Sequence, residues 1–306
     1  MISHPVEVMH TIAVVIPAFG RSHQLARAVD SVLSQSYPNF VLILVNDASS
    51  KDLTSVKCRV ESSGHLWIER ERNGGPAVAR NDGASAVESE WIAFLDSDDE
   101  WFPEKLELQM QWHCENPDFR ISQVHEEWCR NGEKMKKPKY WEQRGGELFA
   151  ESVERCAIGP SCVMMRRDLW NESGGFDERY RVCEDYELWL RITRREEVGL
   201  VPGDTLIRKH GGHTDQLSTS VPALDRYRIA ALIELLAGGI LSEEQARMVK
   251  HGIRSKSAIL AAGAEKRGVD ERAAYYHELA CGDLTGLSAA YASVGGDPFE
   301  FADWAD

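Results

Sequence analysis

Short apolar runs alternate with amphipathic segments along the first hundred residues. The predicted strands span residues 11–16, 40–45, 66–68 and 91–95, the third being the weakest. Between them, one helix is predicted after Ser22, with Leu25, Val29, Val32 and Leu33 at helical spacing, and a second over residues 77–87. This βαβα order predicts a largely parallel sheet covered by helices.

The pattern becomes less regular after this region. Pro103 is expected to open a helix, Asn131-Gly132 to form the tight turn of a hairpin, residues 161–165 to form a buried strand and residues 185–194 a helix. From about residue 220 the composition shifts to Ala, Glu, Leu and Arg with helical periodicity, which predicts three or four helices.

Acidic residues follow two of the predicted strands. Asp47 ends the second strand, and Asp96, Asp98 and Asp99 follow the fourth. Ligands of open α/β sheets bind beyond the carboxyl ends of the strands, so we expect these two strands to be near neighbours facing one crevice. Three aspartates in one turn favour a hard divalent cation such as Mg²⁺ or Mn²⁺. A capped helix start or an acidic surface loop is the alternative, and for Asp47 the alternative is a cap on a turn.

Composition narrows the classes of function. The 306 residues are 43% apolar, but the longest apolar runs are too short to span a bilayer. The N-terminus lacks the features of a secretory signal, so a cytoplasmic location is expected. A net charge of −14 disfavours nucleic-acid binding. Residues 134–139 form a basic cluster, either a solvated loop or a patch facing phosphate or membrane.

Six motifs occur in an order that resembles a known family. They are VVIPAF (14–19), VNDAS (45–49), NGGPAVARN (73–81), FLDSDD (94–99), GGFD (174–177) and EDYELWLR (184–191). Together they resemble family 2 glycosyltransferases of the GT-A fold. The resemblance implies a Rossmann-like mixed α/β sheet flanked by helices over residues 1–218, with an α-helical C-terminal extension over residues 219–306.

The resemblance also implies roles for individual residues. Pro17 and Ala18 would shape the loop over the nucleotide, Asp47 would bind the base or ribose, and Arg80 would reach the base or the diphosphate. Asp96 and Asp98 would form the donor motif, and Asp98 or Asp99 would bind Mn²⁺ or Mg²⁺ directly. Arg208 would contact phosphate oxygens, and His213, with His210 second, would complete the metal site or the closure over the diphosphate.

The acidic pair Glu184-Asp185 would serve the acceptor. By resemblance, Asp185 is the general base, Glu184 orients the acceptor or a neighbouring loop, and the anomeric carbon is inverted. If the resemblance is set aside, the position of an acidic pair at the start of a helix is explained by its favourable interaction with the helix dipole. No QxxRW element follows, which favours transfer of one sugar over polymerisation.

The expected substrates are a nucleoside-diphosphate sugar, with UDP favoured, and a glycan, lipid-linked or protein acceptor in cell-surface glycan assembly. The enzyme would act in the cytoplasm, with peripheral contact to the inner face of the membrane left open. One rival is a sugar-phosphate nucleotidyltransferase, although residues 16–24 lack its Gly-rich basic loop. Another is a catalytically inactive nucleotide-sugar-binding module.

Overall fold

A computed structural model describes residues 10–130, 132–212, 221–284, 286–293 and 295–303. Its centre is a seven-stranded sheet in the order β10-β6-β9-β4-β1-β2-β3. These strands are β1 (Ile12–Ala18), β2 (Phe40–Asn46), β3 (Leu66–Glu69), β4 (Trp91–Phe94), β6 (Ile121–Gln123), β9 (Val163–Arg166) and β10 (Gly199–Leu200). Strands β4, β1, β2 and β3 run parallel, and β9 is antiparallel to both β4 and β6. The predicted mixed α/β sheet is confirmed.

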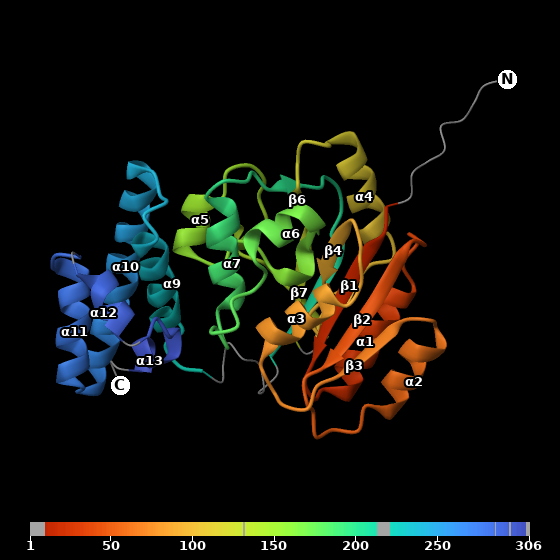
Figure 1. Ribbon diagram of the computed structural model, residues 1–306, viewed down its shortest axis with the longest axis horizontal. Helices are drawn as coiled ribbons and strands as arrows, with labels where there is room; N and C mark the ends of the chain where they lie inside the picture. Colours follow the sequence, from red (N-terminus) through yellow and green to blue (C-terminus); the bar gives the residue numbers. More distant parts are fainter. Residues whose placement is uncertain (1–9, 131, 213–220, 285, 294, 304–306) are drawn as a thin grey trace.

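Helices cover both faces of this sheet (Figure 1). Along β1, Ile12, Val14 and Ile16 belong to one core, which is completed by α1 (Ser22–Leu33), α2 (Thr54–Ser62) and α4 (Lys105–Glu115). Ala13 and Val15 belong to the opposite core, which is completed by α3 (Pro76–Ser85), α6 (Arg167–Ser173) and α7 (Glu184–Thr193). Because both faces are buried, β1 is a continuous apolar run rather than an alternating one.

Two elements start two residues later than predicted. Helix α4 begins at Lys105, because the backbone after Pro103 first forms a turn in which Lys105 N donates to Phe102 O at 3.1 Å. Strand β9 begins at Val163, because the 3₁₀ turn η2 (Pro160–Cys162) precedes it.

A second, four-stranded sheet lies beside the first, in the order β5-β11-β7-β8. Its strands are β5 (Glu100–Trp101), β7 (Glu126–Arg130), β8 (Glu133–Met135) and β11 (Ile207–Gly211). Strands β7 and β8 pair antiparallel, which confirms the predicted hairpin. Strand β5 directly follows the aspartates and pairs with β11, with Arg208 opposite Glu100. This pairing brings residues 207–211 beside the aspartate run.

The C-terminal part is helical, as predicted. Its helices are α9 (Asp225–Ala237), α10 (Glu243–Arg267), α11 (Asp270–Cys281), α12 (Leu287–Ser293) and α13 (Pro298–Asp303), and they lie together at one end of the molecule (Figure 1). The described residues hold five helices rather than three or four, because glycines such as Gly286 and Gly295 divide the last thirty residues into short ones. Phe149 and Val153 of α5 (Phe149–Glu154) and Tyr186 of α7 share one apolar core with α9 and α10.

The expected boundary between residues 218 and 219 falls outside the described residues and stays a prediction. Within the described ranges, none of the helices has the length and apolar character required to cross a bilayer.

The close approach of α3 to the sheet yields a first prediction. A Cβ on Gly83 would overlap the Val15 side chain and lie 3.1 Å from Val45 Cγ2. Both valines are buried and stiff, so Gly83→Ala is expected to lower the free energy of unfolding by about 1–3 kcal/mol in urea denaturation. The matched control is Gly263→Ala in α10, where the nearest atoms belong to the flexible Arg267 side chain at 3.4 Å or more. The control is expected to stabilise by about 0.5–1 kcal/mol, and equal effects of the two substitutions would contradict the packing described.

Candidate active site

The carboxyl ends of three parallel strands meet at one edge of the main sheet. Strand β1 ends at Pro17 and Ala18, with β2 on one side and β4 on the other. Asp47 and Asp96 therefore flank the end of β1, one strand apart, as the sequence predicted. Asp47 N donates to Ala18 O at 2.8 Å, which closes this edge.

The carboxylate of Asp47 binds the turn that precedes α3. It accepts hydrogen bonds from Gly74 N at 2.9 Å, Gly75 N at 2.8 Å and Arg70 Nη1 at 3.0 Å, and it is buried. Gly75 has a φ of +87°, which a residue with a Cβ adopts only with strain. Asp47 thus caps this turn and fixes the start of the helix that carries Arg80, and its expected contact with the base or ribose stays a prediction.

Arg80 joins the two acidic motifs. Its Nη2 donates to Asp96 Oδ1 at 2.6 Å and its Nη1 donates to Glu184 Oε1 at 2.7 Å. The side chain is buried, with its guanidinium 5.1 Å from the centre of the Phe176 ring. Two carboxylates occupy the terminal nitrogens of Arg80, and its expected contact with a base or diphosphate stays a prediction.

Burial and charge set the protonation of these acids. Burial opposes ionisation of Asp96, but the positive charges of Arg80 and Lys209 lower its pKa. Burial raises the pKa of Glu184 to about 7, with Asp185 adding repulsion and Arg80 acting in the opposite direction. Asp96 is therefore charged at neutral pH, whereas Glu184 titrates near neutrality.

The remaining aspartates of the run face different surroundings. Asp98 Oδ2 accepts a hydrogen bond from Arg21 Nη1 at 2.5 Å, and its side chain is 14% exposed. Asp99 is buried and accepts one from Ser161 Oγ at 2.6 Å. Burial raises the pKa of Asp99 well above its usual range. Of the two candidate metal ligands, Asp98 is therefore the one that a metal ion can reach. Asp99 instead stabilises the turn through its hydrogen bond with Ser161.

The carboxylates of the aspartate run suit a metal ion that the protein and a substrate bind together. Among the residues that the structure describes, no three His, Cys, Asp or Glu side chains converge into a ready-made metal cage. Mg²⁺ and Mn²⁺ are commonly held by one or two carboxylates together with substrate phosphates, and Asp98 can serve in such a site. His213 lies outside the described residues.

Strand β11 brings three basic residues beside the run. On one face, Arg208 Nε donates to Glu127 Oε1 at 2.7 Å, and His210 Nε2 lies 3.2 Å from Glu100 Oε2. The expected contacts of Arg208 with phosphate and of His210 with metal would compete with these partners. Lys209 points to the opposite face, as strand alternation requires.

Lys209 was missed by the sequence analysis. Burial disfavours its charge, but Glu126, Asp99 and Asp96 raise its pKa well above the usual value. Its Nζ lies 3.6 Å from Glu126 Oε2. The alternation of side chains along residues 207–211 could have shown that Lys209 faces away from Arg208 and His210.

Asp185 opens α7 as the partly exposed member of the acidic pair. Its Oδ1 accepts a hydrogen bond from Tyr186 N at 2.7 Å, and its Oδ2 accepts one from Cys156 Sγ at 3.2 Å. Cys156 was also missed, because its position 29 residues away gives no pattern. A carboxylate oriented by two donors at a helix N-terminus suits proton abstraction as well as the dipole.

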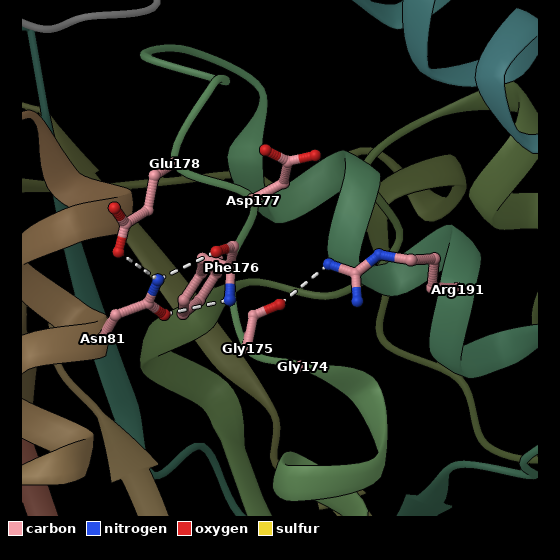
Figure 2. A pocket seen from close by; sticks show the side chains of 7 residues that line it. All are labelled: Asn81, Gly174, Gly175, Phe176, Asp177, Glu178 and Arg191. Carbon is pink, nitrogen blue, oxygen red and sulfur yellow. Dashed lines mark hydrogen bonds between the residues drawn. The ribbon is translucent and has the colours of Figure 1, made fainter.

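The GGFD motif, residues 174–177, carries the Phe176 ring that packs against Arg80. A cavity of about 400 Å³ there is lined by Asn81, Gly174, Gly175, Phe176, Asp177, Glu178 and Arg191. Figure 2 shows Asn81 accepting from Phe176 N at 3.0 Å and donating to Phe176 O at 2.8 Å, with Arg191 donating to Gly175 O at 2.8 Å. These bonds fix the Phe176 ring beside Arg80.

The match of the chain to a protein-family model shows which family it belongs to. The model described as "Glycosyl transferase family 2" matches residues 13–173, more than half of the chain. The chain belongs to glycosyl transferase family 2. The family resemblance inferred from the six motifs is thereby confirmed.

Curated glycosyltransferases match the chain over about two thirds of its length. An uncharacterized glycosyltransferase of Rickettsia bellii is 32% identical over 66% of this chain and 29% of its own length. The chain spans about a third of the length of the first rickettsial relatives that it matches. The Escherichia coli UDP-Glc:alpha-D-GlcNAc-diphosphoundecaprenol beta-1,3-glucosyltransferase WfgD is 27% identical over 63% of this chain and 73% of its own.

Solved structures support the fold of this family 2 member. Staphylococcus aureus TarS 1–349 in complex with UDP-GlcNAc has a TM-score of 0.70 at 16% identity, over 96% of this chain and 82% of that chain. The mannosyltransferase PcManGT of Pyrobaculum calidifontis, in complex with GDP-Man and Mn²⁺, has a TM-score of 0.55 at 17% identity, over 97% of this chain and 83% of that one. The TarS match extends over both the sheet and the C-terminal helices.

Proposed function

We propose that this protein transfers one sugar from a nucleoside-diphosphate sugar to an acceptor hydroxyl, with inversion at the anomeric carbon. The observation that carries the proposal is the double ion pair of Arg80. It places Asp96, of the donor motif, and Glu184, of the acceptor motif, on one guanidinium. Donor and acceptor groups from segments about 90 residues apart thus belong to one site.

The donor half consists of the strand ends around Asp96 and Asp98. A bound Mn²⁺ or Mg²⁺ would stabilise the negative charge that develops on the leaving nucleoside diphosphate. Asp98 would hold that metal, and Asp96, kept charged by Arg80, would orient the sugar nucleotide. A UDP-sugar is favoured because WfgD is named for UDP-Glc and TarS was solved with UDP-GlcNAc.

The acceptor half consists of Asp185 with its two donors. The acceptor hydroxyl loses its proton as its oxygen attacks the anomeric carbon, and Asp185 accepts that proton. The Tyr186 amide and the Cys156 thiol hold the carboxylate in one orientation. Attack from the side opposite the leaving diphosphate gives the inverted product.

The relatives favour a lipid-linked acceptor. The name of WfgD specifies a sugar on a diphosphoundecaprenol carrier, so we infer a glycan-building step of cell-surface assembly. We propose the cytoplasmic face of the membrane as its location. The proposal disfavours the inactive binding module because Arg80 pairs with both Asp96 and Glu184. The nucleotidyltransferase alternative is disfavoured because the loop after β1 lacks a second glycine and a lysine.

Substitution of the proposed metal ligand tests the donor half. Asp98→Ala is expected to weaken metal-dependent binding of nucleoside diphosphate at least about tenfold, because one charged ligand is lost. Calorimetric titration with and without EDTA measures this effect. Asp118→Ala, which removes an aspartate outside the site, is the control. Unchanged binding with unchanged metal dependence would transfer the ligand role to another residue.

The proposed reaction is tested by turnover. The full chain is incubated with UDP-glucose or UDP-N-acetylglucosamine and a synthetic lipid diphosphate bearing α-linked N-acetylglucosamine. Release of UDP with formation of a β-linked product from the α-linked donor, identified by NMR, supports the proposal. Binding of nucleotide without turnover of any donor would favour the inactive module, and an α-linked product would contradict inversion.

A further inference from the structure

A cluster of aromatic side chains, two of them exposed and one half-buried, lies beside the small sheet and α5. It consists of Trp128 on β7 with Tyr140 and Trp141 in η1 (Lys139–Trp141), and we call it the aromatic platform. The Trp128 and Trp141 ring centres are 6.1 Å apart, and those of Tyr140 and Trp141 are 5.5 Å apart. Tyr140 is 56% exposed and Trp141 38%. Rings of this size are normally buried, so their exposure in one cluster needs an explanation.

The platform is held in place by cations beneath it. The buried Arg155 guanidinium lies 4.9 Å from the Tyr140 ring centre and 5.3 Å from that of Trp141. Lys137 Nζ lies 5.2 Å from the Trp128 ring centre. Such contacts order the rings while their remaining surface stays open to solvent.

A small cavity of about 200 Å³ adjoins the platform. It is lined by Tyr140, Arg144, Ala150, Glu151, Glu154 and Arg155. Ligand pockets for larger molecules typically measure about 300–1,000 Å³, so this cavity suits one sugar ring rather than a nucleotide sugar. An aromatic face beside carboxylates and guanidinium groups offers stacking for the ring together with acceptors and donors for its hydroxyls.

Two short chains of contacts connect the platform to the active site. Trp128 Nε1 and Lys137 Nζ both donate to Glu126 Oε1, at 2.7 and 2.9 Å, and Glu126 faces Lys209 beside the aspartates. On the other side, Arg155 is followed in the chain by Cys156, whose thiol donates to Asp185. The platform is therefore linked to Lys209 through Glu126, and to Asp185 through Arg155 and Cys156.

We propose that the aromatic platform binds a sugar ring of the acceptor glycan and thereby aligns the acceptor hydroxyl with Asp185. The inference rests on the proposed function and names a binding site for its acceptor. Anionic lipid fits less well, because Glu151 and Glu154 line the cavity, and because Lys134 and Lys137 of the basic cluster already pair with Glu127 and Glu126.

Fluorine NMR of the full chain labelled with 5-fluorotryptophan tests the site directly. The Trp141 and Trp128 signals are assigned by their loss in Trp141→Phe and Trp128→Phe. The probes are the methyl glycosides of glucose, galactose, mannose, N-acetylglucosamine, N-acetylgalactosamine and rhamnose, and separately phosphatidylglycerol vesicles. At least one glycoside is expected to shift the Trp141 signal. Tyr140→Ala should weaken that binding about 2- to 10-fold, whereas Leu108→Ala, which removes an exposed apolar side chain of α4, should not.

The possible results distinguish a failure of this inference from a failure of the proposed function. Failure of every glycoside to shift the Trp141 signal would overturn the inference, as would a shift caused by vesicles alone. A parallel titration with UDP and Mn²⁺ reports on the donor half. If UDP does not bind while a glycoside still shifts Trp141, the proposed transfer fails and the sugar site stands.

Discussion

Asp185→Asn is expected to lower the rate of sugar transfer about 10²- to 10⁴-fold while leaving nucleotide binding intact. The amide keeps the shape of the carboxylate and can still accept a hydrogen bond from Tyr186 N, but it cannot take the proton of the acceptor hydroxyl. Because the side-chain hydrogen bonds of Asp185 go to Tyr186 N and Cys156 Sγ and not to the aspartate run, the donor half should be unaffected. Release of UDP in the presence of acceptor measures the rate, and calorimetry measures the binding.

Asp270→Asn is a suited control for this substitution. Asp270 also opens a helix, α11, but it is exposed and belongs to the C-terminal extension. The control should leave transfer unchanged. Transfer preserved in Asp185→Asn would instead point to Glu184, whose pKa of about 7 also suits a proton acceptor.

Arg80→Leu is expected to cost about 3–5 kcal/mol of the free energy of unfolding and to abolish transfer. The substitution leaves Asp96 and the buried Glu184 without the guanidinium that neutralises them. In the wild type the pKa of Asp96 is lowered, so its ionised form stabilises the fold above the pKa of the unfolded chain. Without Arg80 both carboxylates must ionise unpaired, so the loss of stability should grow as the pH rises from about 5 to about 8.

Urea denaturation at about pH 5 and about pH 8 measures this dependence. Arg59→Leu is the control, since Arg59 pairs with Asp30 at an exposed position and should contribute at most about 1 kcal/mol. A loss in Arg80→Leu that matched the control, or that shrank as the pH rose, would contradict the role of Arg80 as the bridge.

The sheet and its acidic edge could be predicted because they depend on local patterns. Apolar runs of five to seven residues specify β1, β2 and β4, and the rule for parallel strands then places Asp47 and Asp96 at one edge. The acidic pair at the start of α7 was visible for the same reason. In these cases a helix or strand boundary determines where the side chain lies.

The partners of these residues could not be predicted, because they come from segments distant in the chain. Arg80 meets Glu184 104 residues away, and Ser161 reaches Asp99 across 62 residues. No period in the sequence links such pairs, so the bridging role of Arg80 and the inward position of Asp99 required the structure. Likewise, the aromatic platform depends on η1 lying against Trp128 of β7 and against Arg155, which follows α5.

Binding of a nucleoside diphosphate tests the central claim most directly. The full chain is titrated calorimetrically with UDP, GDP and TDP, each in the presence of Mn²⁺ and then with excess EDTA. We predict that one of the three, UDP being favoured, binds with Mn²⁺ and that EDTA removes the binding. Absence of binding of all three nucleotides under both conditions would contradict a donor site at the carboxyl ends of β1, β2 and β4.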